Sequence, residues 1–206
     1  MFVISPLTKS RTVIVNEISN DERRDYYRIN DTVGFSCSIC KSEKEIPTLE
    51  EFLAEIPDEF QLINYLNRID SDNASLLHTI QEVSPDISRY LKIINAKIDA
   101  LSRHMVTVGS MEEIKFEKIT LSAGGLSLIN DENIALGTIL RTRMVLYPSC
   151  SGILTYGKVV RSFAIPNTEP AQYDTALQYV LIKESDRDVL VRHVLQLQSN
   201  QLRQKK

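Results

Sequence analysis

The feature of this sequence that most constrains its fold is a helical block set between segments that have the pattern of β-strands. A strand-like run over Thr32–Ile39 comes first, and residues 46–107 then carry apolar side chains at helical spacing. Dense strand signals return over residues 112–183, and a second helical pattern follows over residues 185–203. A β-domain with a helical insertion is the simplest arrangement that accounts for this order.

The second strand region is divided by turn signals, among them Gly124-Gly125, Asn130-Asp131 and Pro148. Polar and apolar residues alternate over residues 113–117, which predicts a half-buried strand, and the alternation slips at Lys118–Ile119, which predicts a bulge. Five or six short strands with little helix between them favour an antiparallel sandwich or barrel. The other strands expected here are Leu126–Ile129, Thr138–Tyr147, Ile153–Phe163 and Asp174–Ile182.

Several helix starts carry capping signals. Thr48 and Glu51 have the spacing of a capping box, in which each side chain bonds the backbone N–H of the other residue. Ser84 is a candidate N-cap and Pro85 suits the first helical position of the longest helix. Ser185 is the candidate N-cap of the final helix.

The helix that begins at Pro85 carries apolar residues at successive spacings of 4, 3, 4, 3 and 4, an unbroken heptad seam. The same spacing also fits an ordinary amphipathic helix that packs on its own domain. We favour self-association, because strict heptad spacing is narrower than the usual core-facing stripe. The predicted oligomer interface is Ile87, Leu91, Ile94, Ile98, Leu101 and Met105.

Charge and composition narrow the classes of function. A formal net charge of −3 and a pI near 5.7 argue against binding DNA or RNA through bulk positive charge, so an anionic ligand needs a local basic cluster. No run of about 18 apolar residues is present, so we expect no membrane insertion. At the N-terminus the basic residues follow the apolar stretch, the reverse of a signal peptide. Three cysteines give no disulfide framework and suggest reduced thiols.

The residues that could support catalysis or metal binding do not form a convincing set. Cys37 and Cys40 form a C-x-x-C pair, but a structural zinc site needs four ligands and no second pair is present, so free thiols are the favoured interpretation. His78, His104 and His193 lie in different predicted helices without ligands at a suitable spacing. We therefore expect no metal site, no catalytic site and no enzymatic activity.

Two polar stretches are the best candidates for a binding site. Arg23, Arg24 and Arg28 lie within six residues just before the first strand. Arginine suits forked recognition of phosphate, contact with a guanine edge and stacking on a base. A solvated turn, with these arginines paired to neighbouring acidic residues, is the alternative. The second stretch, Thr120–Gly125, offers hydroxyls and adjacent glycines between two strands, and by itself it also fits a simple hairpin turn.

Together the two stretches resemble the signature of the PilZ domain family, R-x-x-x-R before the first barrel strand and [D/N]-x-S-x-x-G between the next two. Arg24–Arg28 matches the first half, and Thr120–Gly125 matches the second except that Thr120 stands where the family has Asp or Asn. The resemblance implies an α+β fold: a six-stranded antiparallel PilZ-type β-barrel with a long helical insertion after the first strand and a C-terminal helix. The expected division is an N-terminal segment over 1–20, the barrel over 21–45 and 108–206, and an inserted helical oligomerisation region over 46–107.

Many PilZ members bind the bacterial second messenger cyclic di-GMP, often as an intercalated dimer. The resemblance implies that Arg24 and Arg28 contact guanine edges and phosphates and that Arg23 adds a phosphate contact. Thr120, Ser122 and Gly125 would lie on the other side of the ligand, and no other cofactor is expected.

The resemblance further implies a homo-oligomer, with a tetramer favoured over a dimer, an unidentified downstream protein partner and a location in the bacterial cytoplasm. The leading hypothesis is a non-enzymatic cyclic di-GMP receptor. The alternative is a degenerate PilZ scaffold that oligomerises and binds protein partners without the nucleotide. Thr120 separates the two, because its hydroxyl is shorter than a carboxylate or an amide and cannot pair bidentately with a base.

Overall fold

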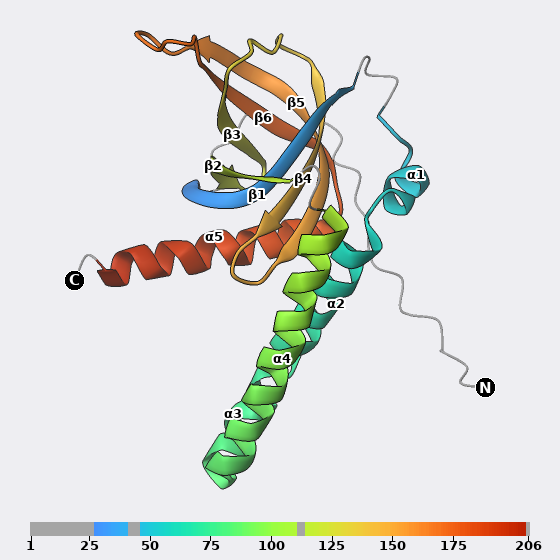
Figure 1. The fold of residues 1–206 in the computed structure, drawn as a ribbon. Coiled ribbons are helices and arrows are strands. Elements are labelled where there is room, and N and C mark those ends of the chain that lie inside the picture. Colours follow the sequence, from blue (N-terminus) through green and yellow to red (C-terminus); the bar gives the residue numbers. More distant parts are fainter. Residues whose placement is uncertain (1–26, 41–45, 111–113, 205–206) are drawn as a thin grey trace.

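The computed structural model describes residues 27–40, 46–110 and 114–204. Six antiparallel strands form a closed barrel in the order β1-β2-β3-β6-β5-β4, and a C-terminal helix crosses one end of it (Figure 1). The predicted six-stranded barrel of the α+β class, with helices after the first strand and at the C-terminus, is therefore confirmed. The strands are β1 (Ile29–Cys40), β2 (Lys115–Ser122), β3 (Gly125–Asn130), β4 (Ile139–Leu146), β5 (Ser151–Ala164) and β6 (Tyr173–Ile182).

Strand β2 differs from its prediction in its phase. Its register with β1 runs without a shift, so the bulge predicted at Lys118–Ile119 is wrong. The sequence pattern places Phe116 on the buried face, but this side chain is 71% exposed, whereas Ile119 and Leu121 fill the barrel core. With the phase set by Ile119 and Leu121, the strand alternates regularly. The register shifts lie instead in the β5–β6 pair.

The insertion between β1 and β2 begins as part of the barrel domain. The predicted capping box is present, with the Thr48 N–H donating to Glu51 Oε2 at 2.8 Å and the Glu51 N–H donating to Thr48 Oγ1 at 3.4 Å. Phe52 and Phe60 pack with Leu154 in a second core on the outer face of the barrel. The helices of the insertion are α1 (Leu49–Ala54), α2 (Asp58–Asp72), α3 (Ala74–Val83) and α4 (Pro85–Ser110).

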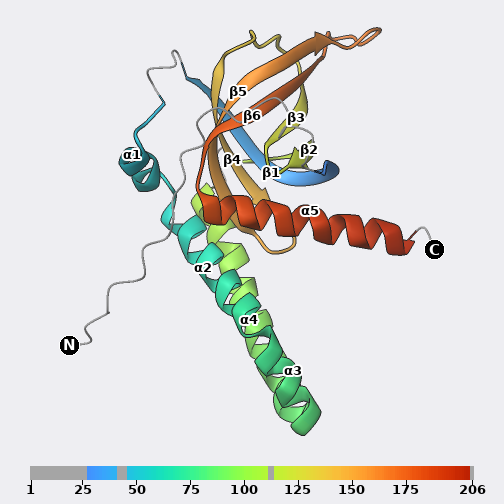
Figure 2. The same cartoon turned by 180° about the vertical axis from the view of Figure 1, so that it is seen from behind.

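The rest of the insertion forms a helical arm, which we define as α3, α4 and the part of α2 beyond the barrel. The arm projects from the barrel, and α4 returns alongside α3 and α2 (Figures 1 and 2). Helix α3 has no buried residue and rests mainly on α4. In the described parts of the chain, no helix combines the length and the apolar character that crossing a membrane requires.

The C-terminal helix, α5 (Glu184–Gln204), closes one end of the barrel. Leu190 and Val194 are buried in the same core cluster as the inward-facing strand residues. The helix begins at Glu184, so the prediction that Ser185 is its N-cap is wrong. The carbonyl of Lys183 accepts the N–H groups of Asp186 and Arg187 at 2.9 and 3.0 Å, because the chain turns directly from β6 into the helix.

Candidate functional site

A hollow of about 740 Å³ lies over the outer face of β1, β2 and β3, beside the start of β1. The strand pleat explains why its lining is polar. Ile29, Ile119 and Leu121 point into the barrel core, so the residues between them point outward. The outward side chains that border the hollow include Arg28, Asn30, Lys118, Thr120 and Ser127, together with Arg161 from β5.

Asn30 and Thr120 form a cross-strand pair at the centre of this outer face. Their Cα positions are direct partners in the β1–β2 register, and Thr120 Oγ1 donates a hydrogen bond of 2.7 Å to Asn30 Oδ1. Residues directly opposite each other on antiparallel strands lie close enough for their side chains to interact. A hydroxyl and an amide are therefore held together on one rung of the sheet.

Three cationic side chains border the hollow: Arg28, Lys118 and Arg161. Arg28 is exposed, while Arg161 Nη2 lies 2.7 Å from Asp174 Oδ2, so part of its charge is offset by that carboxylate. Asp31 and Asp174 also border the hollow, so its three cations exceed its two carboxylates by one positive charge, in a protein with a formal net charge of −3.

A larger hollow of about 950 Å³ lies at the mouth of the barrel and meets the first at Lys118, Leu128 and Ile129. Its charges are mixed: Arg141 pairs with Glu55 at 3.0 Å, and Glu117 adds a carboxylate. Because none of the predicted site residues that the structure describes borders it, we take the smaller hollow as the candidate site.

Comparison with solved structures identifies the architecture. A tetrameric PilZ domain from Xanthomonas campestris, described as self-assembled via an unusual helical bundle, matches with a TM-score of 0.51 and 13% identity. The match covers 87% of this chain and 92% of that chain. This chain has a PilZ-type fold.

Two further solved structures match with lower TM-scores. The inhibitor of motility MotI/DgrA from Bacillus subtilis has 15% identity and a TM-score of 0.45, covering 86% of this chain and 52% of that chain. MrkH from K. pneumonia has 18% identity and a TM-score of 0.39, covering 47% of this chain and 44% of that chain. No protein-family model and no curated protein sequence matches the chain.

On this PilZ-type barrel, Arg28 from the first half of the motif lies near the second half, Thr120–Gly125. Arg28 directly precedes Ile29, which pairs with Leu121, so the first half ends beside the strand end that carries Ser122. Arg28 and Thr120 border the same hollow. Arg23 and Arg24 lie outside the described residues.

Ser122 and Gly125 lie at the β2–β3 turn, where packing accounts for both. Ser122 is buried, and its hydroxyl donates to the Gly125 carbonyl at 3.0 Å. A Cβ atom added to Gly125 would lie 2.1 Å from the Leu177 carbonyl oxygen, so the close approach of β6 requires glycine there. Both residues thus shape the turn beside the hollow, and their contact with a ligand stays a prediction.

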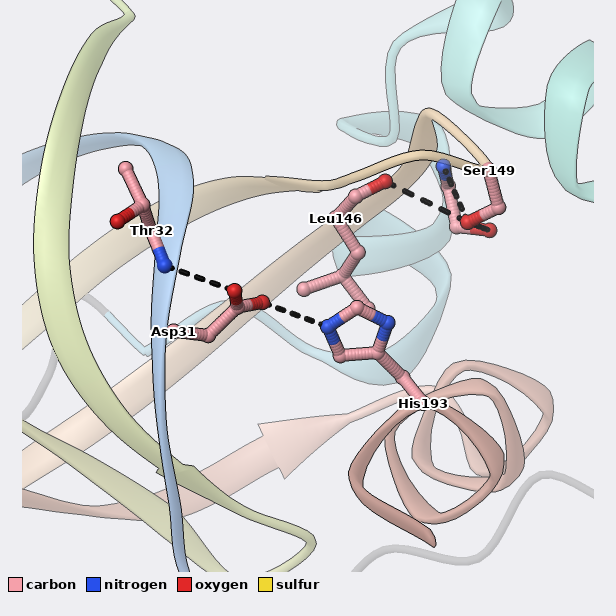
Figure 3. Close-up of polar contacts among 6 residues, drawn as sticks. Asp31, Thr32, Leu146, Ser149 and His193 are labelled. Atoms are coloured by element: carbon pink, nitrogen blue, oxygen red, sulfur yellow. Dashed lines mark hydrogen bonds and ion pairs between the residues drawn. The ribbon is translucent and has the colours of Figure 1, made fainter. Parts of the chain in front are cut away.

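Helix α5 is anchored to both motif-bearing segments. Arg187 Nη1 donates to the carbonyl of Ala123, in the β2–β3 turn, at 2.7 Å. At the next anchor, His193 Nε2 lies 2.7 Å from Asp31 Oδ2, and Figure 3 shows the two side chains meeting between β1 and α5. The other oxygen of Asp31 accepts the Thr32 N–H at 2.8 Å (Figure 3). These contacts hold the start of β1 and the β2–β3 turn against α5.

The predicted heptad seam lies largely on the outside of the arm. Ile87 and Leu101 are 57% and 67% exposed, and Ile98 and Met105 are also exposed, whereas Leu91 and Ile94 are half-buried. The side of α4 that faces α2 and α3 is more polar: Ser88 is buried there, and the Asn95 amide donates to Asp70 at 3.4 Å. The more apolar side of α4 is thus the side that the arm itself does not cover.

Sequence reasoning did not identify Asn30, Lys118 or Arg161 as site residues. Asn30 and Lys118 alternate with the buried residues Ile29 and Ile119, so a pleat with the correct phase places them outward. Arg161 follows the register shift between Val159 and Arg161, and no periodicity predicts its place at the hollow.

Proposed function

We propose that this protein is a non-enzymatic receptor for cyclic di-GMP that signals through its helical arm. The observation that carries the proposal is the meeting of Arg28 and Thr120, one from each half of the PilZ motif, at a single hollow on a PilZ-type barrel. The volume of about 740 Å³ falls within the usual range of small-molecule pockets, roughly 300–1,000 Å³.

The chemistry of the hollow suits a cyclic dinucleotide with two phosphates and two guanines. Arg28 and Lys118 supply positive charge for a phosphate, and Arg28 can also form a fork to the O6 and N7 atoms of guanine. Arg23 and Arg24 precede Arg28 closely in sequence and would add further contacts of the same kind. An intercalated ligand dimer would place several bases against these side chains.

We infer that the arm assembles copies of this protein, with a tetramer favoured over a dimer. Four of the six seam residues are exposed in the single chain, and apolar surface of this kind is stabilised when another helix covers it. The tetrameric PilZ domain of Xanthomonas campestris, self-assembled via a helical bundle, supports the same arrangement here. The proposal places the protein in the bacterial cytoplasm, where it would act on a downstream protein.

Isothermal titration calorimetry of the purified protein with cyclic di-GMP tests the receptor proposal. Charge-assisted contacts of about 1–3 kcal/mol predict that Arg28→Ala weakens binding about 5- to 150-fold. Added salt should reduce the difference, because part of the contact is attraction to phosphate. Arg203→Ala, which removes the same charge from the exposed end of α5, is the matched control and should leave the affinity unchanged.

One observation favours the alternative, a PilZ scaffold that oligomerises and binds protein partners without the nucleotide. The Thr120 hydroxyl is already bonded to Asn30, and packing accounts for Ser122 and Gly125. Thr120→Asp restores the residue type of the family and should tighten binding if position 120 faces the ligand. No heat of binding from the wild type, and none from Thr120→Asp, would instead support the scaffold.

A further inference from the structure

The hydrogen bond between Thr120 and Asn30 fixes which way the Asn30 amide faces. Asn30 is exposed on the outer face of β1 and borders the hollow beside Arg28. Its Oδ1 atom accepts the Thr120 hydroxyl at 2.7 Å, so the oxygen side of the amide is directed toward β2. The Nδ2 atom, which carries two N–H donors, is therefore the part of the amide left for a ligand.

A donor-only group distinguishes the two purines. Guanine presents two acceptors, O6 and N7, on its major-groove edge, whereas adenine presents the N7 acceptor beside the N6 amino donor. An amide with its oxygen already engaged matches the guanine edge. It meets the adenine amino group donor against donor, and a polar group left unpaired in a site costs affinity.

We propose that Asn30 is a specificity-determining residue of this hollow, which selects guanine over adenine, and that Thr120 is the positioning residue that orients it. This inference rests on the proposed function, because it assumes that a cyclic dinucleotide occupies the hollow. The family pattern has Asp or Asn at the position of Thr120, and here the amide stands instead on the facing position of the neighbouring strand. This rung of the sheet therefore carries an amide, but on β1 rather than on β2.

An exchange experiment tests the inference directly. Asn30→Thr should weaken cyclic di-GMP binding about 5- to 150-fold, and the double variant Asn30→Thr with Thr120→Asn should recover most of the loss by returning the amide to β2. Asn95→Thr, the same exchange on the arm, is the control and should bind as the wild type does. Melting temperatures of all variants establish that they are folded. For Asn30→Thr we expect this because threonine suits a strand position.

The role of Thr120 needs a different readout, the ratio of the dissociation constants for cyclic di-AMP and cyclic di-GMP. Thr120→Val removes the hydroxyl and keeps the shape, so the amide becomes free to turn its oxygen toward adenine. The ratio of the cyclic di-AMP dissociation constant to the cyclic di-GMP dissociation constant should therefore fall, because selectivity for guanine is lost. This fall should be larger than the fall in affinity for cyclic di-GMP. A purely structural role for Thr120 would lower both affinities together.

The outcomes separate this inference from the function on which it rests. If the wild type binds cyclic di-GMP and Asn30→Thr keeps both its affinity and its purine preference, the inference is overturned and the receptor proposal stands. If Asn30→Thr loses binding but the double variant does not recover, the exchange of roles across the rung is overturned. If the wild type binds neither dinucleotide, the inference and the receptor proposal fall together.

Discussion

Asp186, in the first turn of α5, lies where α5, α2 and the barrel meet, and its burial predicts how stability depends on pH. Its side chain is buried, with the residue only 3% exposed. Its Oδ1 atom accepts hydrogen bonds from Asn64 Nδ2 of α2 at 3.4 Å and from the Ser185 hydroxyl at 3.3 Å. Asn64 also exchanges two hydrogen bonds with the backbone of Gly152 on β5, at 2.7 and 3.1 Å.

Burial raises the pKa of Asp186 from 3.8 to about 6, and the nearby Lys183 and these two hydrogen bonds offset only part of that effect. Since the folded pKa lies above the unfolded one, the folded state holds the proton more tightly. Asp186 therefore does not reduce the free energy of unfolding below about pH 4, where it is protonated in both states. The free energy of unfolding falls as the pH rises from about 4 to about 6, and the cost persists above that window. At 1.36 kcal/mol for each pH unit, the cost is about 3 kcal/mol.

Asp186→Asn removes the ionisation and keeps the acceptor oxygen. We expect a gain of about 2 kcal/mol in the free energy of unfolding at pH 7.5, since a carboxylate at a helix start also has a favourable dipole contribution of roughly 0.3–1 kcal/mol that is lost. The measurement is urea unfolding followed by circular dichroism between pH 4 and pH 8 at one protein concentration. The gain should shrink toward zero as the pH falls to about 4.

Asp188→Asn is the matched control, because Asp188 lies in the same part of α5 but is exposed. It should change stability by no more than a few tenths of a kcal/mol at any of these pH values. An Asp186→Asn variant that is less stable than the wild type at pH 7.5, or whose difference from the wild type does not vary with pH, would refute the argument from burial.

Two further predictions concern the β2–β3 turn and the arm. Gly125→Ala brings a Cβ within 2.1 Å of the Leu177 carbonyl oxygen, so β6 must shift, and urea unfolding should show a loss of about 1–3 kcal/mol or more; an unchanged midpoint would contradict the close approach. Replacing Ile94 and Ile98 together with Asp puts charge into the proposed interface, at a cost of several kcal/mol for each buried site. Light scattering should then report a smaller species than the wild type, and a wild type that is monomeric at tens of micromolar would contradict self-association through the seam.

Much of the fold follows from the sequence because its signals are local. The capping box at Thr48, the helix start at Pro85 and the turns that separate the strands each depend on neighbouring residues. The phase of β2 does not depend on neighbouring residues alone. Phe116 and Ile119 are both apolar but lie on opposite faces of the strand, and only the closed barrel determines that Ile119 is the buried one. Local signals therefore predict the elements better than the face that each element buries.

The candidate site depends still more on long-range pairing. Arg28 and Thr120 could be predicted because a motif names them. Asn30 becomes a neighbour of Thr120 only through the β1–β2 register, and Arg161 reaches the hollow through an irregular part of β5. For Gly125 the motif predicts the residue but not its role. The structure shows a packing role, because the Leu177 carbonyl approaches too closely for any side chain.

The arm also bears on how the barrel closes during folding. Strands β1 and β2 are adjacent in the sheet although four helices separate them in sequence, and each doubling of a flexible loop adds about 0.6 kcal/mol to the entropic cost of joining its ends. Because α4 returns alongside α2 and α3, the folded arm brings its two ends back to the barrel (Figure 2). For the pairing of β1 with β2, the arm then acts as a short connection. Its length can change by whole helical turns without altering the distance that the barrel must close.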